Sequence, residues 1–257
     1  MQRVIGKTAI VTGGSQGVGL RIASVLAAQG YDIVLLVRRQ REVAQRAIAQ
    51  LQNLGVRAAF WQVDITDRAA LRAAMSAIVA DFGAPQLLVN NAGASAAAPL
   101  LELTDAQWQL VLDTQLTGTF LACVETVIHM KPGGVIINIA GASAHRCYPD
   151  AGAFGPSKAG VVNLTAQMSI EWASRGIRVC GISPGPIRDA DSNWQLHEPL
   201  LAKEVARLPL QRPVSSDEVA QSVAFLASPA AAAFTGQMLV LDSGGLNTWY
   251  MTQQEER

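Results

Sequence analysis

A glycine-rich turn between a short apolar run and a longer helical pattern constrains this chain more than any other feature. The run Thr8–Val11 leads into the sequence TGGSQGVG, residues 12–19, which opens a helical pattern over 17–29. Glycines permit a tight turn and let the backbone approach a pyrophosphate, whose charge then lies at the helix N-terminus. Because a strand precedes the turn and a helix follows it, the sequence predicts a dinucleotide-binding loop rather than a simple glycine turn.

The same alternation of short apolar runs and helical patterns continues along the chain. Several runs are continuously apolar, which is typical of strands covered on both faces. The alternation predicts a doubly wound α/β fold of Rossmann type, a parallel sheet with helices on both faces. Strands are expected at Thr8–Val11, Asp32–Val37, Arg57–Gln62, Leu87–Asn90, Gly134–Ile139, Arg178–Ile182 and Met238–Leu241. Helices are expected at 17–29, 40–53, 67–82, 104–130, 153–175 and 216–227.

The chain contains no long linker and no repeat, so we expect one nucleotide-binding domain over residues 1–257. The segment 186–212 breaks the strand–helix pattern, because it is long, mixed in composition and irregular. Loops of this length are usually lids or binding loops, or else mobile. A substrate lid is the favoured interpretation, and a mere insertion is the other.

Charge and composition exclude several classes of protein. Twenty basic and twenty acidic residues give a net charge of zero, whereas nucleic acids and anionic membranes need a basic excess in their partners. The apolar stretches are shorter than the roughly 20 residues of a membrane span, and the first residues do not form a signal peptide. Cys123, Cys147 and Cys180 match no metal spacing. We therefore expect a cytoplasmic protein with reduced thiols, without metal, membrane or nucleic acid.

The end of the second expected strand indicates which dinucleotide is bound. After Val37 the chain reads Arg38-Arg39, where a carboxylate would accept a hydrogen bond from the ribose 2′-hydroxyl of NAD. Two guanidinium groups can instead pair with the 2′-phosphate of NADP. This pattern favours NADP(H) over NAD(H). The alternative is that one or both arginines are merely solvated at the start of a helix.

Further motifs follow the glycine loop in order: Val63-Asp64-Ile65, Asn90-Asn91-Ala92-Gly93, Ser183-Pro184-Gly185-Pro186, Thr235-Gly236-Gln237 and Asp242-Ser243-Gly244-Gly245. Over nearly its whole length the chain thus resembles the short-chain dehydrogenase/reductase family. The resemblance implies a Rossmann-type domain that binds NAD(P)(H) and is usually a homodimer or homotetramer.

The resemblance also implies cofactor-binding residues. They are Gly13, Ser15, Gln16, Gly17, Val18 and Gly19 at the pyrophosphate, Asp64 and Ile65 at the adenine, Asn90, Gly93 and Lys158 on the ribose side, and Pro184, Gly185 and Ile187 beside the nicotinamide. Arg38 and Arg39, at the end of the second strand, join this set as the expected partners of a 2′-phosphate. One departure is that family members preferring NADP often carry a basic residue where this chain has Gln16.

The catalytic positions depart much further from the family. The family uses a Tyr-x-x-x-Lys pair, a serine thirteen residues before the tyrosine, and an asparagine on the preceding helix. Here the pair reads Phe154 and Lys158, the serine position is Gly141, and the asparagine position is Gln115. Phenylalanine has no proton to give, so ordinary carbonyl reduction is either lost or uses other groups.

Candidate replacements lie close by in the sequence. Ser143, His145 and Tyr148 follow the expected fifth strand, and each can donate a proton or a hydrogen bond. General acid–base catalysis typically contributes about 10²–10⁴-fold, so a reductase without any such group would be slow. For each of the three, an ordinary role on a surface loop is the alternative.

Two long helical patterns are apolar nearly all round, at 106–130 and 157–174. A helix of this kind is buried on both sides, whereas a single sheet covers only one. We therefore expect a homodimer or homotetramer, or a hetero-oligomer with an active paralogue. The alternative is a cover formed by the segment 186–212 and the chain ends.

Three functional hypotheses follow. The first is an NADP(H)-dependent oxidoreductase with non-standard proton-transfer residues, acting on a small, largely apolar molecule. The second is a catalytically inactive subunit, a pseudoenzyme that binds an active paralogue. The third, lyase or isomerase chemistry without hydride transfer, is disfavoured because the glycine loop is intact. The segment 186–212 suggests an apolar substrate with a polar group, because it combines apolar Trp194, Leu196 and Leu200 with polar Asp189 and His197.

Overall fold

In the computed structural model, which describes residues 6–248, seven parallel strands form one sheet in the order β3-β2-β1-β4-β5-β6-β7. The strands are β1 (Lys7–Thr12), β2 (Tyr31–Val37), β3 (Ala58–Gln62), β4 (Pro85–Asn90), β5 (Val135–Ile139), β6 (Arg178–Pro184) and β7 (Met238–Leu241). Every expected strand is present, with ends that differ by at most two residues from the prediction. The doubly wound α/β fold is thereby confirmed.

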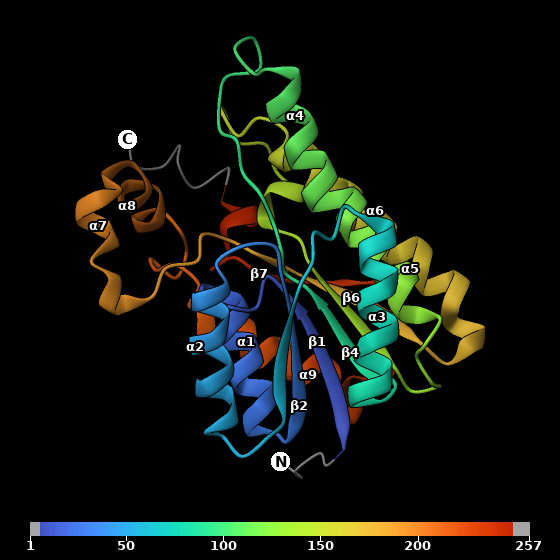
Figure 1. The fold of residues 1–257 in the computed structure, drawn as a ribbon. Coiled ribbons are helices and arrows are strands. Elements are labelled where there is room, and N and C mark those ends of the chain that lie inside the picture. The colour runs from blue at the N-terminus through green and yellow to red at the C-terminus, as the bar shows by residue number, and fades with distance from the viewer. Residues whose placement is uncertain (1–5, 249–257) are drawn as a thin grey trace, which may run out of the picture.

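Helices cover both faces of this sheet (Figure 1). The principal helices of the fold are α1 (Gly17–Ala28), α2 (Arg41–Gln52), α3 (Arg68–Phe82), α4 (Asp105–Leu112), α5 (Gly118–Val127), α6 (Phe154–Trp172) and α9 (Ser216–Ala227). Alternate residues of β1 enter different cores: Ala9 and Val11 pack with α1, α2 and α9, whereas Ile10 packs with α3, α5 and α6. This two-sided burial explains why the strands are continuously apolar.

The helix expected at 104–130 is interrupted, which corrects the prediction. A π-helical segment, η1 (Asp113–Thr117), separates α4 from α5, and the amide of Gly118 donates to the carbonyl of Asp113 five residues earlier. The hydroxyl of Thr119 also donates to the carbonyl of Gln115, at 2.7 Å. Single π turns inside helices often occur at functional sites, and this one carries Gln115.

The segment 186–212 is more regular than expected. It contains η4 (Ala190–Ser192), α7 (Trp194–His197) and α8 (Pro199–Ala206), which stand away from the sheet in Figure 1. Trp194 is buried, and Pro199 occupies the first turn of α8, where its missing N–H is tolerated. Arg188 and Glu198 pair across the segment. The expectation of an irregular loop was wrong for Trp194–Ala206, where α7 and α8 form and Pro199 starts α8.

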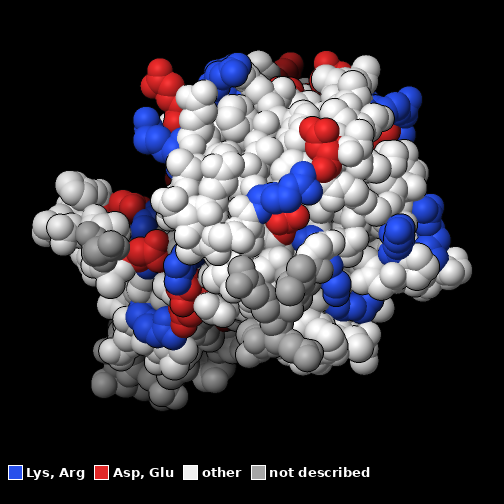
Figure 2. Space-filling model, turned by 60° about the horizontal axis from the view of Figure 1, so that its bottom comes forward, with Lys and Arg blue, Asp and Glu red and all other residues white. Residues whose placement is uncertain are grey.

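Charged side chains of both signs lie next to one another on the face shown in Figure 2, with wide uncharged areas between them. Within the described part of the chain, no helix is both long and apolar enough to cross a membrane.

Candidate functional site

A cavity of about 480 Å³ lies over the glycine loop, at the carboxyl ends of β1 and β2. Many predicted cofactor residues line it: Gly13, Ser15, Gln16, Gly17, Val18, Gly19, Arg38, Arg39, Asp64, Ile65 and Gly93. The segments that contribute them are far apart in sequence, and the parallel sheet brings them together at one edge. In open α/β sheets this edge is where ligands bind.

Close approach of the backbone explains the glycine at position 19. A Cβ atom added to Gly19 would lie 2.5 Å from the carbonyl oxygen of Gly13 and 2.5 Å from the side-chain nitrogen of Asn91. Gly17, by contrast, has a φ of +53° and open space where a side chain would project. The loop is therefore closed against the protein at Gly19 and open towards the cavity at Gly17.

The N-terminus of α1 is available to an anion. Its N-cap residue, Gln16, makes no side-chain capping hydrogen bond, and the first turn carries no acidic residue. The backbone N–H groups of a helix N-terminus favour negative charge. The site therefore has the polarity that a phosphate requires.

Asn91, which was not among the predicted cofactor residues, holds the glycine loop in place. Its side-chain nitrogen donates to the carbonyl oxygens of Thr12 and Gly13, at 3.2 and 3.3 Å. In return, the hydroxyl of Thr12 accepts from the backbone N–H of Asn91, at 3.0 Å. The sequence feature that could have indicated this role is the position of Asn91, directly after a buried strand and two residues before Gly93.

Asn90, which was expected on the ribose side, lies in a buried network instead. Its amide nitrogen donates to Asn138 at 2.8 Å and to the sulfur of Cys123 at 3.1 Å. Asn90 joins β4 to β5 and α5 through these contacts and is absent from the cavity lining. The cavity instead includes residues that we did not predict, namely Leu36, Val37, Gln40, Val63, Asn91, Ala92 and Thr114.

The two arginines after β2 have different surroundings. The guanidinium of Arg38 lies 3.7 Å from the carboxylate of Asp64. Burial raises the pKa of Asp64, but hydrogen bonds from Thr66 and the charge of Arg38 outweigh it, so the pKa is lowered overall. The side chain of Arg39 forms no ion pair or hydrogen bond within residues 6–248. Arg39 is therefore the guanidinium that an additional phosphate can engage.

Lys158 is buried at the start of α6, with only 6% of its surface exposed. Its Nζ donates to the carbonyl of Ile139 at 2.9 Å and lies 5.5 Å from the centre of the Phe154 ring. Burial lowers the pKa of Lys158 to about 8. The spacing of Phe154 and Lys158 places both on one helical face, as predicted.

The remaining catalytic candidates are divided between different surroundings. Ser143 lies beside Gly141 and Phe154, and its hydroxyl oxygen is buried without a partner among the described residues. The ring nitrogen Nε2 of His145 lies 2.9 Å from the hydroxyl of Ser183. Tyr148 lines another cavity, of about 220 Å³, whose lining includes neither Ser143 nor Lys158. Burial also raises the pKa of Tyr148, which makes it a weaker acid.

Gln115 and the residues expected near the nicotinamide lie outside the 480 Å³ cavity, and Gly185 lines the 220 Å³ cavity together with Tyr148. The Gln115 amide donates to the carbonyl of Ala94 at 2.9 Å and packs against the backbone of Gly93. The backbone N–H of Gly185, next to Pro184, donates to the carbonyl of Leu241 at 2.7 Å. Ile187 forms an isolated β-bridge with Val214. None of Pro184, Gly185 and Ile187 is in the lining of the 480 Å³ cavity.

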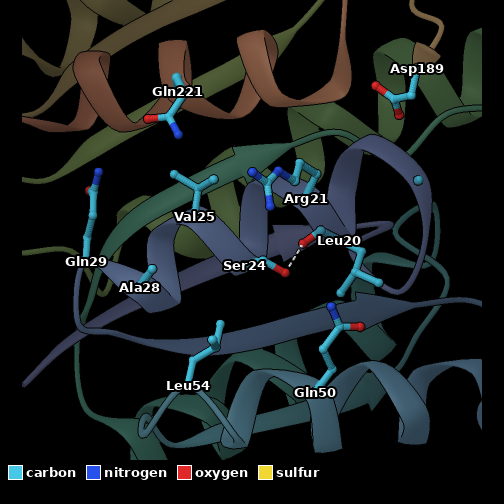
Figure 3. A pocket seen from close by; sticks show the side chains of 11 residues that line it. Leu20, Arg21, Ser24, Val25, Ala28, Gln29, Gln50, Leu54, Asp189 and Gln221 are labelled. Carbon is cyan, nitrogen blue, oxygen red and sulfur yellow. Dashed lines mark hydrogen bonds between the residues drawn. The ribbon is translucent and has the colours of Figure 1, made fainter. Parts of the chain in front are cut away.

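A larger cavity, of about 940 Å³, lies between α1, α2 and α9 (Figure 3). Arg21, Ser24 and Gln221 face it, but it shares only Gly17 with the cavity over the glycine loop and contains no catalytic candidate. Size alone therefore does not identify the functional site.

Comparison with known proteins gives matches along nearly the whole chain. The family described as "Enoyl-(Acyl carrier protein) reductase" matches residues 13–246. The chain is 34% identical over 243 residues to 3beta-hydroxysteroid dehydrogenase 1 of Eggerthella lenta, covering 93% of each chain. It is 32% identical over 240 residues to a 3-oxoacyl-[acyl-carrier-protein] reductase of Staphylococcus aureus, covering 93% of this chain and 97% of the relative.

Two solved structures are similar over the same extent. A short-chain dehydrogenase/reductase from Serratia marcescens superposes with a TM-score of 0.90 at 30% identity, covering 95% of this chain and 100% of the other. A short chain dehydrogenase from Burkholderia cenocepacia in complex with NADP gives a TM-score of 0.87 at 32% identity, covering 95% and 99%.

Proposed function

The chain belongs to the short-chain dehydrogenase/reductase family, and from this premise we propose that it is an NADP(H)-dependent oxidoreductase with non-standard proton-transfer residues, acting on a small, largely apolar molecule. The family uses NAD(P). The observation that carries the proposal is the cavity over the glycine loop, where the loop, the open N-terminus of α1 and Arg39 meet.

The residues present fit a nicotinamide dinucleotide. Gly19 leaves no room for a side chain, and the first turn of α1 has no acidic group to repel a phosphate. The loop would hold the pyrophosphate, Asp64 and Ile65 the adenine, and Lys158 the nicotinamide ribose. When bound, the dinucleotide supplies or accepts a hydride.

Two observations support NADP over NAD. Arg38 and Arg39 both line the cavity, and Arg39 has no partner in the described structure. Guanidinium groups bind phosphate through charge-assisted hydrogen bonds. The Burkholderia cenocepacia relative was crystallised with NADP, which agrees with this preference.

Non-standard proton transfer is supported by the side chains at the start of α6 and after β5. Phe154 presents a ring without a hydroxyl beside Lys158, and Gly141 presents no side chain at all. Gln115 occupies the π-helical segment where the family resemblance implies an asparagine.

An apolar substrate is supported by the helices of the segment 186–212. Leu196 and Leu200 are exposed on α7 and α8. Exposed leucines on a segment that stands away from the sheet provide an apolar surface for a ligand. The three cysteines are free, which supports a reducing cytoplasm.

We further propose that the chain is a homodimer or homotetramer. Trp108, Phe120 and Ile170 are exposed on α4, α5 and α6. These helices pack around η1 and form one side of the molecule. Large apolar side chains gathered on one side are typical of an interface between subunits.

The alternative is a catalytically inactive subunit that binds an active paralogue. Phe154 and Gly141 favour it, because both remove a hydroxyl from the positions that the family uses for chemistry. The same exposed face on α4, α5 and α6 would then contact a different chain.

A turnover measurement distinguishes the active oxidoreductase from the inactive subunit. The purified chain is mixed with NADPH and a panel of apolar ketones, iminium ions and conjugated acceptors, and NADPH oxidation is followed by absorbance. The proposal predicts oxidation with at least one acceptor. NADPH binding without any turnover, together with a defined complex with a paralogue, would favour the inactive subunit.

A further inference from the structure

The cavity of about 220 Å³ lies at the same edge of the sheet as the cavity over the glycine loop, but beyond the ends of β5, β6 and β7. Its lining includes Ala142 of the short helix η2 (Ala142–Ala144), which follows β5. Gly185 follows within a residue of β6, and Asp242 follows β7. Because the family resemblance implies Gly185 beside the nicotinamide, this cavity is the place for a substrate.

The size and the apolar part of the lining limit the ligand. A cavity of about 220 Å³ is smaller than the roughly 300–1,000 Å³ of sites that bury a drug-sized ligand. Its apolar side chains are those of Ala142, Pro186, Val205 and Leu208. The cavity therefore suits a small molecule with an apolar body.

The guanidinium of Arg146 is held in a fixed orientation at this cavity. Its Nη1 donates to the carbonyl of Gly245 at 3.0 Å, and its central carbon lies 5.3 Å from the centre of the Tyr148 ring. A guanidinium has five N–H donors, and Arg146 uses only Nη1 in a hydrogen bond within residues 6–248. Arg146 thus presents an oriented cation with donors still available.

Two further donors line the same cavity. The hydroxyl of Tyr148 forms no hydrogen bond within residues 6–248; burial raises the pKa of the phenol, and the charges of Glu204 and Asp242 add to the effect of burial, so it stays protonated and can donate. Arg207, at the C-terminal end of α8, has no ion-pair partner in the described part of the chain.

Acceptors are fewer than donors in the lining. The two carboxylate oxygens of Asp242 already accept from the backbone N–H groups of Gly244 and Leu246, at 2.9 and 2.6 Å. Glu204, exposed on the last turn of α8, is the carboxylate that has no hydrogen bond or ion pair within residues 6–248. The excess of available donors favours a ligand that brings acceptor oxygens.

We propose that this cavity binds a small organic carboxylate. Arg146 and Tyr148 donate hydrogen bonds to the carboxylate oxygens, Arg207 adds positive charge from α8, and the apolar body packs against Val205 and Leu208. A planar guanidinium matches the geometry of a carboxylate, and such charge-assisted hydrogen bonds are strong. This inference rests on the proposed oxidoreductase function and deepens it, because it makes the polar group of the substrate anionic.

The first test locates binding at Tyr148. The chain has three tyrosines, so labelling with 3-fluorotyrosine gives three ¹⁹F signals, and Tyr148→Phe identifies one of them. The labelled protein is titrated at pH 6.5, with and without NADPH, with benzoate, its neutral analogue benzamide and the cation benzylamine. We expect benzoate to shift the Tyr148 signal and to leave that of Tyr31, buried in β2, unchanged.

The three probes have similar size and differ in charge. We expect benzamide and benzylamine to bind at least about fivefold more weakly than benzoate. Equal affinity for benzoate and benzamide would overturn the inference, because the charge would then not be recognised. Tighter binding of benzylamine would overturn it as well and would make Glu204 the anchor of a cationic ligand.

The second test follows the same Tyr148 signal in charge variants. Arg146→Gln should weaken benzoate about tenfold and benzamide less than about twofold. Glu204→Gln should tighten benzoate about threefold, because a neighbouring negative charge is removed. Lys203→Gln, on exposed α8 but outside the cavity lining, is the matched control and should change either affinity less than about twofold.

Arg146 also contacts Gly245, so melting temperatures show whether Arg146→Gln is still folded. Arg146→Lys provides a second variant, since it keeps the charge but not the planar group, and it should lose less benzoate affinity than Arg146→Gln. If folded Arg146→Gln binds benzoate as the Lys203→Gln control does, Arg146 is not the anchor and the inference is wrong.

The results separate the carboxylate site from the proposed function. If NADPH binds but benzoate is not preferred at Tyr148, the carboxylate site is contradicted while the oxidoreductase remains. If benzoate binds through Arg146 but NADPH does not bind, the proposed function fails and the carboxylate site stands.

Discussion

The guanidinium of Arg38 lies 3.7 Å from the carboxylate of Asp64, and both side chains line the cavity over the glycine loop. The pair joins the end of β2 to the segment after β3 and engages one of the two arginines that can bind a 2′-phosphate. Arg39 is left without a partner in residues 6–248, so the two arginines are expected to contribute differently to cofactor choice.

We predict that Arg39→Ala weakens NADPH binding about tenfold or more, because charge-assisted hydrogen bonds to phosphate contribute about 1.5–3 kcal/mol. NADH binding should change less than about twofold, since NADH lacks the 2′-phosphate. Arg46→Ala, on the exposed side of α2, is the control. Calorimetric titration measures both affinities, and an equal loss for both cofactors would contradict the assignment.

Gly17→Ala tests whether the open side of the glycine loop faces the cofactor. The positive φ of +53° strains an alanine, by about 1–2 kcal/mol, but no protein atom blocks its methyl group. Gly133→Ala adds a methyl group at another glycine of positive φ, +89°, which also has open space around it and does not line the cavity. We expect similar losses of melting temperature in both variants and lost NADPH binding only in Gly17→Ala. Equal NADPH affinity in the two variants would place the pyrophosphate elsewhere.

Acid stability depends on Glu125, whose side chain on α5 is only 1% exposed. Hydrogen bonds from Arg72 and Arg68 hold its pKa at about 2, below the ordinary 4.5. A depressed carboxyl pKa stabilises the fold above about pH 4.5, and this contribution is lost as the pH falls towards 2.

We therefore expect the wild-type melting temperature to fall further between pH 6 and pH 3, by about 3 °C or more, than that of Glu125→Gln. Glu102→Gln, an exposed change, should follow the wild type. Parallel acid losses in the wild type and Glu125→Gln would show that another group controls acid unfolding.

Restoring the family's residues tests how far the catalytic pocket has changed. Phe154→Tyr with Gly141→Ser should raise activity on simple ketones at least about tenfold, because a phenol is a direct proton donor. The same variant also carries Ser143→Ala, because the new Cβ at position 141 would lie only 3.3 Å from Ser143 Oγ and the serine side chain there would crowd it. No gain, at retained NADPH affinity and melting temperature, would mean that the substrate pocket itself differs from the family's.

Subunit association is tested at Ile170, which is 79% exposed on α6. Ile170→Asp should shift the protein towards monomers, because a buried unpaired charge opposes an apolar interface. Leu196→Asp, at an 80% exposed site on α7, is the matched control and should leave the mass unchanged. Light scattering after size-exclusion chromatography measures the mass. A monomeric mass for the wild-type chain would contradict the proposed homodimer or homotetramer.

The sheet could be predicted from the sequence because each strand is buried on both faces. Ile10 and Val11 pack into opposite cores, so the run must be continuously apolar, and such runs are easily recognised. The glycine loop was equally predictable, since Gly19 touches the backbone of Gly13 and tolerates no side chain.

Features that depend on tertiary packing could not be predicted in this way. Gly118 directly follows the π-helical segment around Gln115, and a Cβ there would lie 2.7 Å from the side chain of Ile65, a contact invisible in the local pattern. The same holds for Ser143: the sequence places it near the site, but only the turn of η2 shows where its hydroxyl lies. Asn90 and Asn91 are neighbours with different roles, which only the strand register separates.

The central claim is that the chain binds NADP(H) in the cavity over the glycine loop, and a parallel titration with NADPH and NADH tests it most directly. Calorimetry or quenching of tryptophan fluorescence reports the binding. We predict an NADPH dissociation constant in the micromolar range, about −8 kcal/mol, and weaker NADH binding. If neither dinucleotide binds, the glycine loop is a relic, and the chain acts through a partner subunit rather than through hydride transfer.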